Sequence, residues 1–334
     1  MKTKNYNIPI FIPELACPHQ CVFCNQKKIS GQQKMPSVDD IQLTIENHLS
    51  TIDTSNSKTE IAFFGGNFTG INYSDQVKYL EAVKKYSNYG VKGIRISTRP
   101  DYISNEILLN LKYFNVTSIE LGAQSFDADV LKSSGRGHSV NSIYRASRLI
   151  HDFGFELGLQ MMIGLPGDSL EKSIFTANEI IKLRAKTTRI YPTLVIKNTA
   201  LANLFFSGKY NPLSINESII WLSQLIPIFE KSNVNILRVG LHPTEGLLNG
   251  NDLVAGPFHQ SIREMAYSNI WKNILFNSIT QKSNSILIEV APSELNYAIG
   301  YKSENRKLLL EIFKNVTIKP KASLTNRNFN AIYY

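Results

Sequence analysis

The feature that most constrains the fold of this chain is the regular alternation of short apolar runs with helical patterns over its first two thirds. The apolar runs predict strands at residues 8–12, 61–64, 93–97, 118–122, 155–163 and 189–196. Segments with helical patterns lie between them, at residues 37–49, 74–86, 105–113, 140–153 and 169–183. Strands separated by helices at this interval indicate βαβ units and a parallel sheet. The pattern therefore predicts an α/β fold, a partial (β/α)6 barrel of the TIM type.

Glycines and polar residues follow the ends of these predicted strands. A cysteine-rich loop comes directly after the first strand, and turn-forming or polar segments follow or lie on the others. These segments are 65–67, 97–101, 122–125, 164–167 and 191–193. In barrels of this type the chemistry takes place at the carboxyl ends of the strands. The sequence therefore predicts one site to which each strand contributes residues.

Three cysteines, the only ones in the chain, form the loop after the first strand as Cys17, Cys21 and Cys24. An odd number of cysteines and the lack of a secretory signal argue against disulfide bonds. Three thiolates on one loop can hold three irons of a cubane cluster and leave the fourth iron open to an exogenous ligand. Zinc is the alternative, and its fourth ligand would then be His19 or a distant histidine. The spacing alone leaves both alternatives open.

The spacing C-x3-C-x2-C, with the aromatic Phe23 before the last cysteine, resembles that of the radical S-adenosylmethionine (SAM) superfamily. The resemblance implies that Cys17, Cys21 and Cys24 hold a 4Fe–4S cluster whose open iron binds the amino and carboxylate groups of SAM. It also implies an electron donor such as flavodoxin or ferredoxin. With that electron, SAM is cleaved reductively to a 5′-deoxyadenosyl radical.

The resemblance also gives a cofactor-binding meaning to the segment after the second strand. Gly65, Gly66 and Asn67 occupy the place where the backbone of such enzymes approaches the amino group of SAM. Many members have glutamate where this chain has Asn67, so this position must act through its amide or through backbone carbonyls. A glycine pair is also common in an ordinary tight turn.

Four residues at the ends of the next strands are further candidates for binding SAM. Ser97 and Arg99 end the third strand, and a guanidinium fork suits the SAM carboxylate. The alternative is a surface arginine beside a turn. Gln124 is a candidate for the SAM ribose or the substrate, and the backbone at Gly164 for the adenine. Glu120 is costly in a buried strand unless it is paired, so we expect a nearby cation, Arg95 or Arg99.

Candidate substrate-binding residues are less specific. Tyr191 lies on the sixth predicted strand, where an inward tyrosine suits a substrate contact, and it also suits the core. His138 follows Arg136 and Gly137, and a lone histidine is more often a cap or a surface residue. Lys302 and Arg306 lie in or next to a turn, residues 300–303, that resembles the nucleic-acid-gripping GxxG loop of KH domains. An ordinary corner between helices is the alternative.

Five short segments together resemble a narrower family, the radical SAM domain of the Elongator catalytic subunits, which modify the wobble uridine of tRNA. The segments are 97–101, 120–125, 136–138, 162–167 and 190–193, in that order and spacing. The resemblance covers roughly residues 5–245. Those subunits also carry an acetyltransferase domain, for which residues 246–334 are too few and lack a pyrophosphate-binding glycine loop. The resemblance thus extends to the radical chemistry and not to the acetyl-CoA-dependent reaction.

Charge and hydropathy limit which partners and which cellular compartment we expect for this chain. The formal net charge of +9 favours a polyanionic partner, although a lysine-rich solvated surface gives the same value. No window has the roughly 18 consecutive apolar residues of a membrane span. Residues 1–5 lead directly into the first strand and leave no room for a targeting peptide. We therefore expect a cytoplasmic protein without membrane contact.

The weaker alternation beyond residue 200 predicts a second, smaller part. We expect helices at residues 215–232, 259–278 and 303–314, strands at 235–241 and 286–290, and a loop at 243–257. Residues 1–245 are thus predicted to form the radical SAM core barrel, and residues 246–334 a small, basic, KH-like α+β extension. The resemblance implies an enzyme that modifies tRNA or other RNA. The alternatives are a radical SAM enzyme for a small metabolite or protein, or an RNA-binding protein with a structural cluster.

Overall fold

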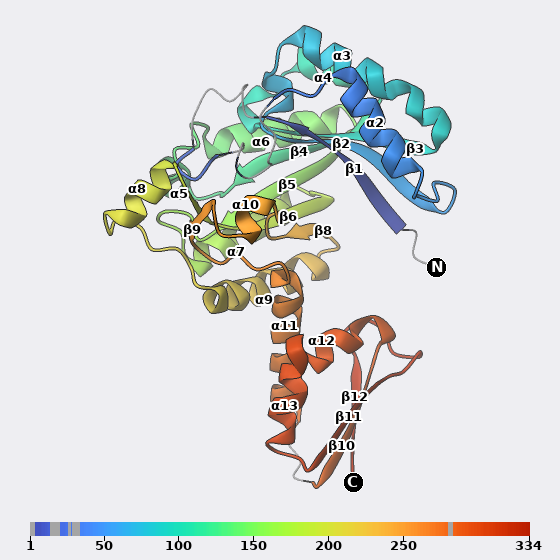
Figure 1. The fold of residues 1–334 in the computed structure, drawn as a ribbon, viewed down its shortest axis with the longest axis vertical. Coiled ribbons are helices and arrows are strands. Elements are labelled where there is room, and N and C mark those ends of the chain that lie inside the picture. Colours follow the sequence, from blue (N-terminus) through green and yellow to red (C-terminus); the bar gives the residue numbers. More distant parts are fainter. Residues whose placement is uncertain (1–3, 14–20, 26–27, 29–33, 280–282) are drawn as a thin grey trace. The chain divides into compact units, whose positions relative to one another are not determined.

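The computed structural model describes residues 4–13, 21–25, 28, 34–279 and 283–334 (Figure 1). The described residues form two compact units. The first unit comprises residues up to Leu213 together with Ile228–Phe258, and the second comprises Ser214–Pro227 and His259–Tyr334. The predicted domain boundary after residue 245 stays a prediction, because a compact unit is not the same as a domain that folds alone.

A parallel sheet forms the centre of the first unit and curls into a partial barrel (Figure 1). Its strand order is β1-β2-β3-β4-β5-β6-β8, and every neighbouring pair is parallel. The strands are β1 (Lys4–Ile12), β2 (Ser57–Gly65), β3 (Val91–Thr98), β4 (Val116–Gln124), β5 (Glu156–Ile163), β6 (Thr187–Pro192) and β8 (Asn235–Val239). The predicted α/β partial barrel is confirmed. The strand predicted at residues 235–241 joins the same sheet, next to β6.

Helices connect the strands of this sheet. They are α2 (Val38–Leu49), α3 (Tyr73–Lys84), α4 (Asn105–Tyr113), α5 (Ala128–Ser133), α6 (Val140–Asp152) and α7 (Leu170–Lys182). All of them except α3 begin at a serine or aspartate whose side chain accepts a hydrogen bond from the first turn. Ser37 and Asp40 form a capping box at α2: the Asp40 N–H donates to Ser37 Oγ at 3.1 Å, and the Ser37 N–H donates to the Asp40 carboxylate at 2.9 Å. The sequence did not predict the short helix α5.

The core of the first unit is apolar on one face of the sheet, whereas the other face also carries buried charged side chains such as Arg95 and Glu120. Central strands such as β4 are buried over nearly their whole length, as expected for parallel strands covered by helices. Ile61, Ile96, Ile119 and Leu159 are completely buried in neighbouring strands. Burial of each such side chain contributes roughly 1.5–3 kcal/mol. This core holds the strand ends in register, and the register decides which side chains meet there.

The chain leaves the sheet earlier than the sequence predicts. Residues 189–196 were expected to form one strand, but β6 ends at Pro192 and a separate strand β7 (Val195–Ile196) follows. Pro192 has no N–H for a further ladder bond, and the Thr193 N–H and hydroxyl both donate to the Ile163 carbonyl. The short strand β7 pairs antiparallel with β9 (Leu253–Ala255). The expected loop at 243–257 therefore contains a strand, and it also contains helix α10 (Glu245–Leu248).

The second unit packs helices against one three-stranded sheet. Its elements are most of α9 (Ile215–Lys231), α11 (Ile262–Ser278), β10 (Ser285–Val290), α12 (Leu295–Ile299), α13 (Glu304–Leu310), β11 (Asn315–Pro320) and β12 (Phe329–Tyr333). The central strand β10 is parallel to β11 and antiparallel to β12. Trp271, Ile288 and Phe313 are buried at the centre of its core. The predicted α+β extension is confirmed, with two C-terminal strands that the sequence did not predict. Among the described residues, no helix is long and apolar enough to cross a membrane.

Candidate active site

A cavity of about 680 Å³ opens at the carboxyl ends of the strands of the first unit. Each strand from β1 to β6 contributes to its wall, and so does the cysteine loop. Of the residues predicted from the sequence, the wall contains Cys21, Phe23, Cys24, Gly65, Gly66, Ser97, Arg99, Gln124 and Tyr191. The parallel register places these strand ends side by side, as expected for a barrel of this type.

The cysteine loop is attached to the rest of the first unit by backbone hydrogen bonds. The Val22 N–H donates to the Ser134 carbonyl at 3.1 Å, and the Val22 carbonyl accepts from the Leu201 N–H at 2.7 Å. Cys21 is 5% exposed, and Cys24 is partly buried one turn further on. Cys17 and His19 lie outside the described residues. Two of the three predicted ligands therefore face the cavity.

A close approach of two strands requires glycine at the end of β2. Gly65 has a φ of +107°, and a Cβ atom there would lie 2.2 Å from the Ile12 carbonyl oxygen. The Gly66 N–H donates to the same oxygen at 2.8 Å. Asn67 is fully buried and does not line the cavity. Its Oδ1 accepts from Thr98 Oγ1 at 2.6 Å and joins the end of β2 to the end of β3.

Arg99 lines the cavity with its guanidinium already bound to a carboxylate of this chain. Its Nε and Nη2 atoms donate to the two oxygens of Asp101 at 3.0 and 2.9 Å. Nη2 also donates to the Arg136 carbonyl at 2.7 Å. Burial alone would raise the pKa of Asp101, but Arg99 holds this pKa below its usual value. The guanidinium fork predicted to meet the SAM carboxylate thus has an internal partner.

Gln124 combines a strained backbone with a buried acceptor that has no partner in the described part of the chain. It ends β4 beyond a β-bulge, with a φ of +67°. Its Oε1 atom is buried and receives no hydrogen bond from the described residues. Left-handed backbone at a residue other than glycine is costly and concentrates at functional sites. An unsatisfied buried oxygen in a cavity wall fits a ligand that donates a hydrogen bond.

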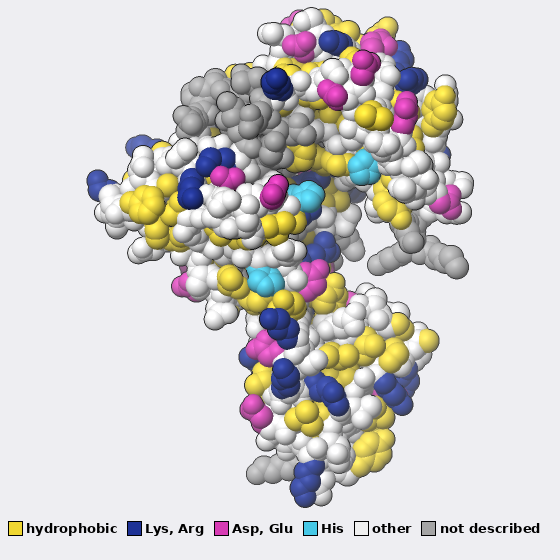
Figure 2. All heavy atoms as spheres, in the orientation of Figure 1, with side chains coloured by type: hydrophobic (Ala, Val, Ile, Leu, Met, Phe, Trp, Pro, Cys, Tyr) yellow, Lys and Arg dark blue, Asp and Glu magenta, His cyan; other side chains and the backbone are white. Residues whose placement is uncertain are grey.

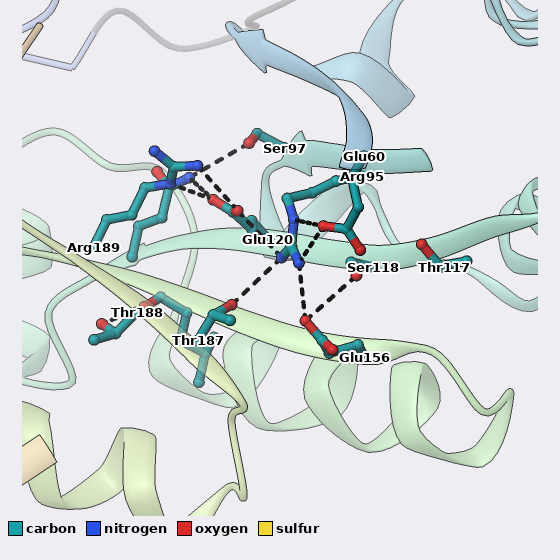
Figure 3. Close-up of polar contacts among 12 residues, drawn as sticks. Glu60, Arg95, Ser97, Thr117, Ser118, Glu120, Glu156, Thr187, Thr188 and Arg189 are labelled. Atoms are coloured by element: carbon teal, nitrogen blue, oxygen red, sulfur yellow. Dashed lines mark hydrogen bonds and ion pairs between the residues drawn. The ribbon is translucent and has the colours of Figure 1, made fainter. Parts of the chain in front are cut away.

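A buried ion-pair network lies beneath the cavity, with Glu120 at its centre (Figure 3). The Glu120 side chain is 1% exposed and meets Arg189 Nε at 2.7 Å and Arg95 Nη1 at 3.3 Å. Arg95 also pairs with Glu60 and Glu156, at 2.8 and 2.9 Å. Although burial alone would raise it, the two guanidinium groups hold the pKa of Glu120 below its usual value. The predicted cation for Glu120 is confirmed as Arg95.

Several lining residues were not predicted from the sequence. They are Arg136, Gln160, Met162, Arg189, Arg238 and His242, among others. Arg189 stacks on the Phe64 ring, with 4.4 Å from its Cζ to the ring centroid, and Gln160 donates to Glu120 at 2.9 Å. Arg189 lies on β6, two strands away from Glu120 on β4, so its pairing with Glu120 becomes visible only once the strand register is known.

The remaining predicted residues lie in several places. Tyr191 faces the cavity, and burial raises its pKa. Gly164 is outside the wall: its N–H donates to Asp168, and its carbonyl accepts from the Tyr210 hydroxyl at 2.6 Å. His138 is buried behind the wall. Burial, followed by the charge of Arg136, lowers the pKa of His138 to about 4.

Lys302 and Arg306 belong to the second unit and are exposed. The turn that carries Lys302 joins α12 to α13. Its backbone is left-handed at Lys302 and at Ser303, with φ values of +52° and +62°. The expected helix at 303–314 begins at Glu304 and ends at Leu310. The structure thus places a strained, exposed, basic turn where the sequence predicted one.

Comparison with known proteins identifies the family. Residues 12–179 match the Radical SAM superfamily, and residues 185–272 match the Radical_SAM C-terminal domain. Elongator complex protein 3 of Dictyostelium discoideum is 34% identical over 165 residues, which are 48% of this chain and 29% of that protein. An uncharacterized protein of Methanocaldococcus jannaschii is 31% identical over 232 residues, 65% of this chain and 70% of that one.

One further relative is similar in sequence, and one solved structure is similar in fold. The tRNA uridine(34) acetyltransferase of Methanocaldococcus infernus is 27% identical over 259 residues, 64% of this chain and 48% of that protein. The solved structure of Elp3 from the same organism, with an N-terminal deletion, superposes with a TM-score of 0.66 at 21% identity. It covers 82% of this chain and 64% of that one. The chain spans only 29 to 35% of the Elongator relatives compared above and of their mammalian counterparts.

Proposed function

Because this chain belongs to the radical SAM superfamily, we propose that Cys17, Cys21 and Cys24 hold a 4Fe–4S cluster and that SAM binds in the adjoining cavity. Together the cluster and SAM would supply a 5′-deoxyadenosyl radical. It would come from reductive cleavage of SAM with one electron from a flavodoxin- or ferredoxin-type donor. The residues present fit these groups. The observation that carries the proposal is a cavity that contains two of the cysteines and an amide oxygen of Gln124 that no described residue of the chain binds.

The residues of the cavity wall have separate tasks in this proposal. Gln124 Oε1 accepts a hydrogen bond, which a ribose hydroxyl can donate. Ser97 and the backbone at Gly65 and Gly66 supply further polar groups at neighbouring strand ends. Phe23 and other apolar side chains of the wall exclude water, which protects a reactive species from side reactions.

Metal content and SAM binding test this assignment. The protein is reconstituted anaerobically with iron and sulfide, and Cys17→Ala, Cys21→Ala and Cys24→Ala are treated identically. We expect about four irons and four sulfides per wild-type chain, with a loss of the cluster in each variant. Gln124→Ala should keep the cluster and bind SAM about tenfold more weakly, the effect of one lost hydrogen bond. A wild-type chain that binds zinc and no iron–sulfur cluster would contradict the proposal.

For the substrate we propose tRNA or another RNA. Support comes from the relative named as a tRNA uridine(34) acetyltransferase and from the net charge of +9. Figure 2 shows Lys and Arg side chains on the surface of both units. The turn at Gly300–Ser303 adds a KH-like feature with Lys302 and Arg306 exposed. A small metabolite or a protein is the alternative substrate. A chain with these partners would act in the cytoplasm.

Binding to total tRNA separates these substrates. Exchange of Lys302 and Arg306 together for alanine should weaken tRNA binding severalfold and reduce the salt dependence of the affinity. The control is the double alanine variant of Lys84 and Lys85, two exposed lysines of the first unit. This exchange removes the same amount of positive charge. If both variants weaken binding equally, the turn has no specific role. If the wild type does not retain tRNA at 0.15 M salt, the RNA proposal fails.

A further inference from the structure

Arg136 is a buried cation without a carboxylate partner in the described part of the chain. Its side chain lies in the cavity wall, and the residue is 7% exposed. The other buried arginines are Arg95, Arg99 and Arg189, and each of them forms an ion pair with at least one carboxylate. A buried charge is costly unless an opposite charge accompanies it. The position of Arg136 therefore calls for an anion that is not a carboxylate of this part of the chain.

The guanidinium of Arg136 is directed at the cysteine loop. Its Nη1 atom donates to Cys21 Sγ at 3.3 Å, within hydrogen-bond distance for sulfur. Its Nη2 atom donates to the Gly122 carbonyl at 2.6 Å, and Nε donates to His138 Nε2 at 3.1 Å. All three guanidinium nitrogens are thus engaged, two of them by neutral acceptors. The sulfur of Cys21 is the one partner that can carry a negative charge.

The orientation of Arg136 is fixed from several sides. The Arg136 carbonyl accepts from Arg99, and its N–H donates to the Leu131 carbonyl at 3.1 Å. His138 accepts through Nε2, so the proton of the neutral ring is on Nδ1, which lies 3.4 Å from the Ser139 carbonyl. The side chain is therefore held in place before any ligand binds, which is the condition for a tuned site.

We propose that Arg136 compensates the negative charge on the cluster through its hydrogen bond to Cys21 and thereby raises the reduction potential, with His138 as a positioning residue. The inference rests on the proposed cluster ligation. Reduction adds one electron from the external donor to the cluster and moves no proton, so the reduced form carries one more negative charge. A donor at a ligand sulfur stabilises that form more than the oxidised form.

A redox titration followed by EPR tests this role on the reconstituted full chain. In Arg136→Met the midpoint potential should fall by about 59 mV, which corresponds to a tenfold change in the one-electron equilibrium. His138→Leu should lower it in the same direction and by less. The matched control is Arg238→Met, because Arg238 lines the same cavity and donates to the carbonyls of Gly240 and Leu241 and, among the described residues, to no cysteine. The midpoint potential of this control should shift so little that the one-electron equilibrium constant changes by less than threefold.

Other outcomes overturn the inference in distinguishable ways. Equal shifts in Arg136→Met and Arg238→Met would show a general charge effect without a role for the hydrogen bond to Cys21. An unchanged potential with SAM binding weakened more than tenfold would assign Arg136 to SAM. A wild-type chain without a 4Fe–4S signal would overturn the proposed function itself.

A wild-type measurement decides the matter if the variants do not fold. The chain is produced with arginine labelled with ¹⁵N in the guanidinium group, and the reduced cluster is examined by pulsed EPR. Among the described residues, Arg136 is the arginine that donates to a cysteine, so we expect a resolved ¹⁵N coupling. Absence of that coupling would overturn the inference.

Discussion

Glu120→Gln is the substitution for which the structure gives the sharpest expected loss of stability. Glu120 is fully buried and joins Arg95 and Arg189 in the network of Figure 3. Without its charge, Arg95 keeps Glu60 and Glu156, but Arg189 loses the carboxylate with which it pairs. Removal of one partner from a buried ion pair costs about 3–5 kcal/mol, because the other charge stays buried. We therefore expect Glu120→Gln to lower the free energy of unfolding by about 4 kcal/mol.

Glu156→Gln is the matched control in the same network. The Glu156 side chain is 28% exposed, and Arg95 retains Glu60 and Glu120 when the charge of Glu156 is removed. An exposed pair contributes about 0–1 kcal/mol. Urea unfolding followed by circular dichroism, on cluster-free full-length chains under anaerobic conditions, measures both variants. A loss below about 1 kcal/mol in Glu120→Gln, or an equal loss in Glu156→Gln, would refute the reasoning.

Two further substitutions test the strand ends and the wall of the cavity. Gly65→Ala should cost about 3 kcal/mol or more in urea unfolding, since its Cβ would meet the Ile12 carbonyl at 2.2 Å. Gly154→Ala, also at positive φ but with nothing within 4 Å, should cost about 1–2 kcal/mol, and equal losses would contradict the steric argument. Burial and the charge of Arg136 lower the pKa of His138 to about 4, so the folded chain favours the neutral ring. The free energy of unfolding of the wild type should therefore fall as the pH drops from 6.5 through 4. In His138→Gln the free energy of unfolding should fall by about 3 kcal/mol less than in the wild type over this pH range. Identical stability profiles of variant and wild type would show that His138 titrates normally.

The sequence was most informative where the physics is local. The cap formed by Ser37 and Asp40 follows from two residues three positions apart, and the structure confirms it. Strand ends could also be located from local patterns, because a parallel sheet brings all of its carboxyl ends to one edge. This explains why Ser97, Gln124 and Tyr191 meet in one cavity, although they are far apart in the chain.

The sequence was least informative where side chains from different strands choose between partners. Arg99 shows a local choice that the sequence analysis also did not predict: Asp101, two residues along the chain, binds its Nε and Nη2 atoms, and the contact of Arg99 with a ligand carboxylate stays a prediction. The pairing of Glu120 with Arg189 depends on the register of β4, β5 and β6, which a single sequence does not state. At Gly164, Asp168 and Tyr210 bind the backbone N–H and carbonyl, and the predicted contact of this backbone with adenine stays a prediction.

The break after β6 has a related cause. Residues 189–196 look like one strand, but β6 ends at the pair of Ile163 with Pro192, because Pro192 has no N–H to donate and the Thr193 hydroxyl joins its N–H on the Ile163 carbonyl. The partner of the short strand β7 comes from residues 253–255, in a segment whose glycines and asparagines predict only a loop. Pairings between residues this far apart depend on tertiary packing, which outweighs local preference.

The production of 5′-deoxyadenosine tests the central claim most directly. The reconstituted chain is incubated anaerobically with SAM and dithionite, and the products are quantified by liquid chromatography and mass spectrometry, with Cys21→Ala as the control. We predict that the wild type releases 5′-deoxyadenosine and methionine in equal amounts, that added tRNA increases the yield, and that Cys21→Ala releases neither. A wild-type chain that carries the full 4Fe–4S cluster and binds SAM, yet forms no 5′-deoxyadenosine with or without tRNA, would contradict the account.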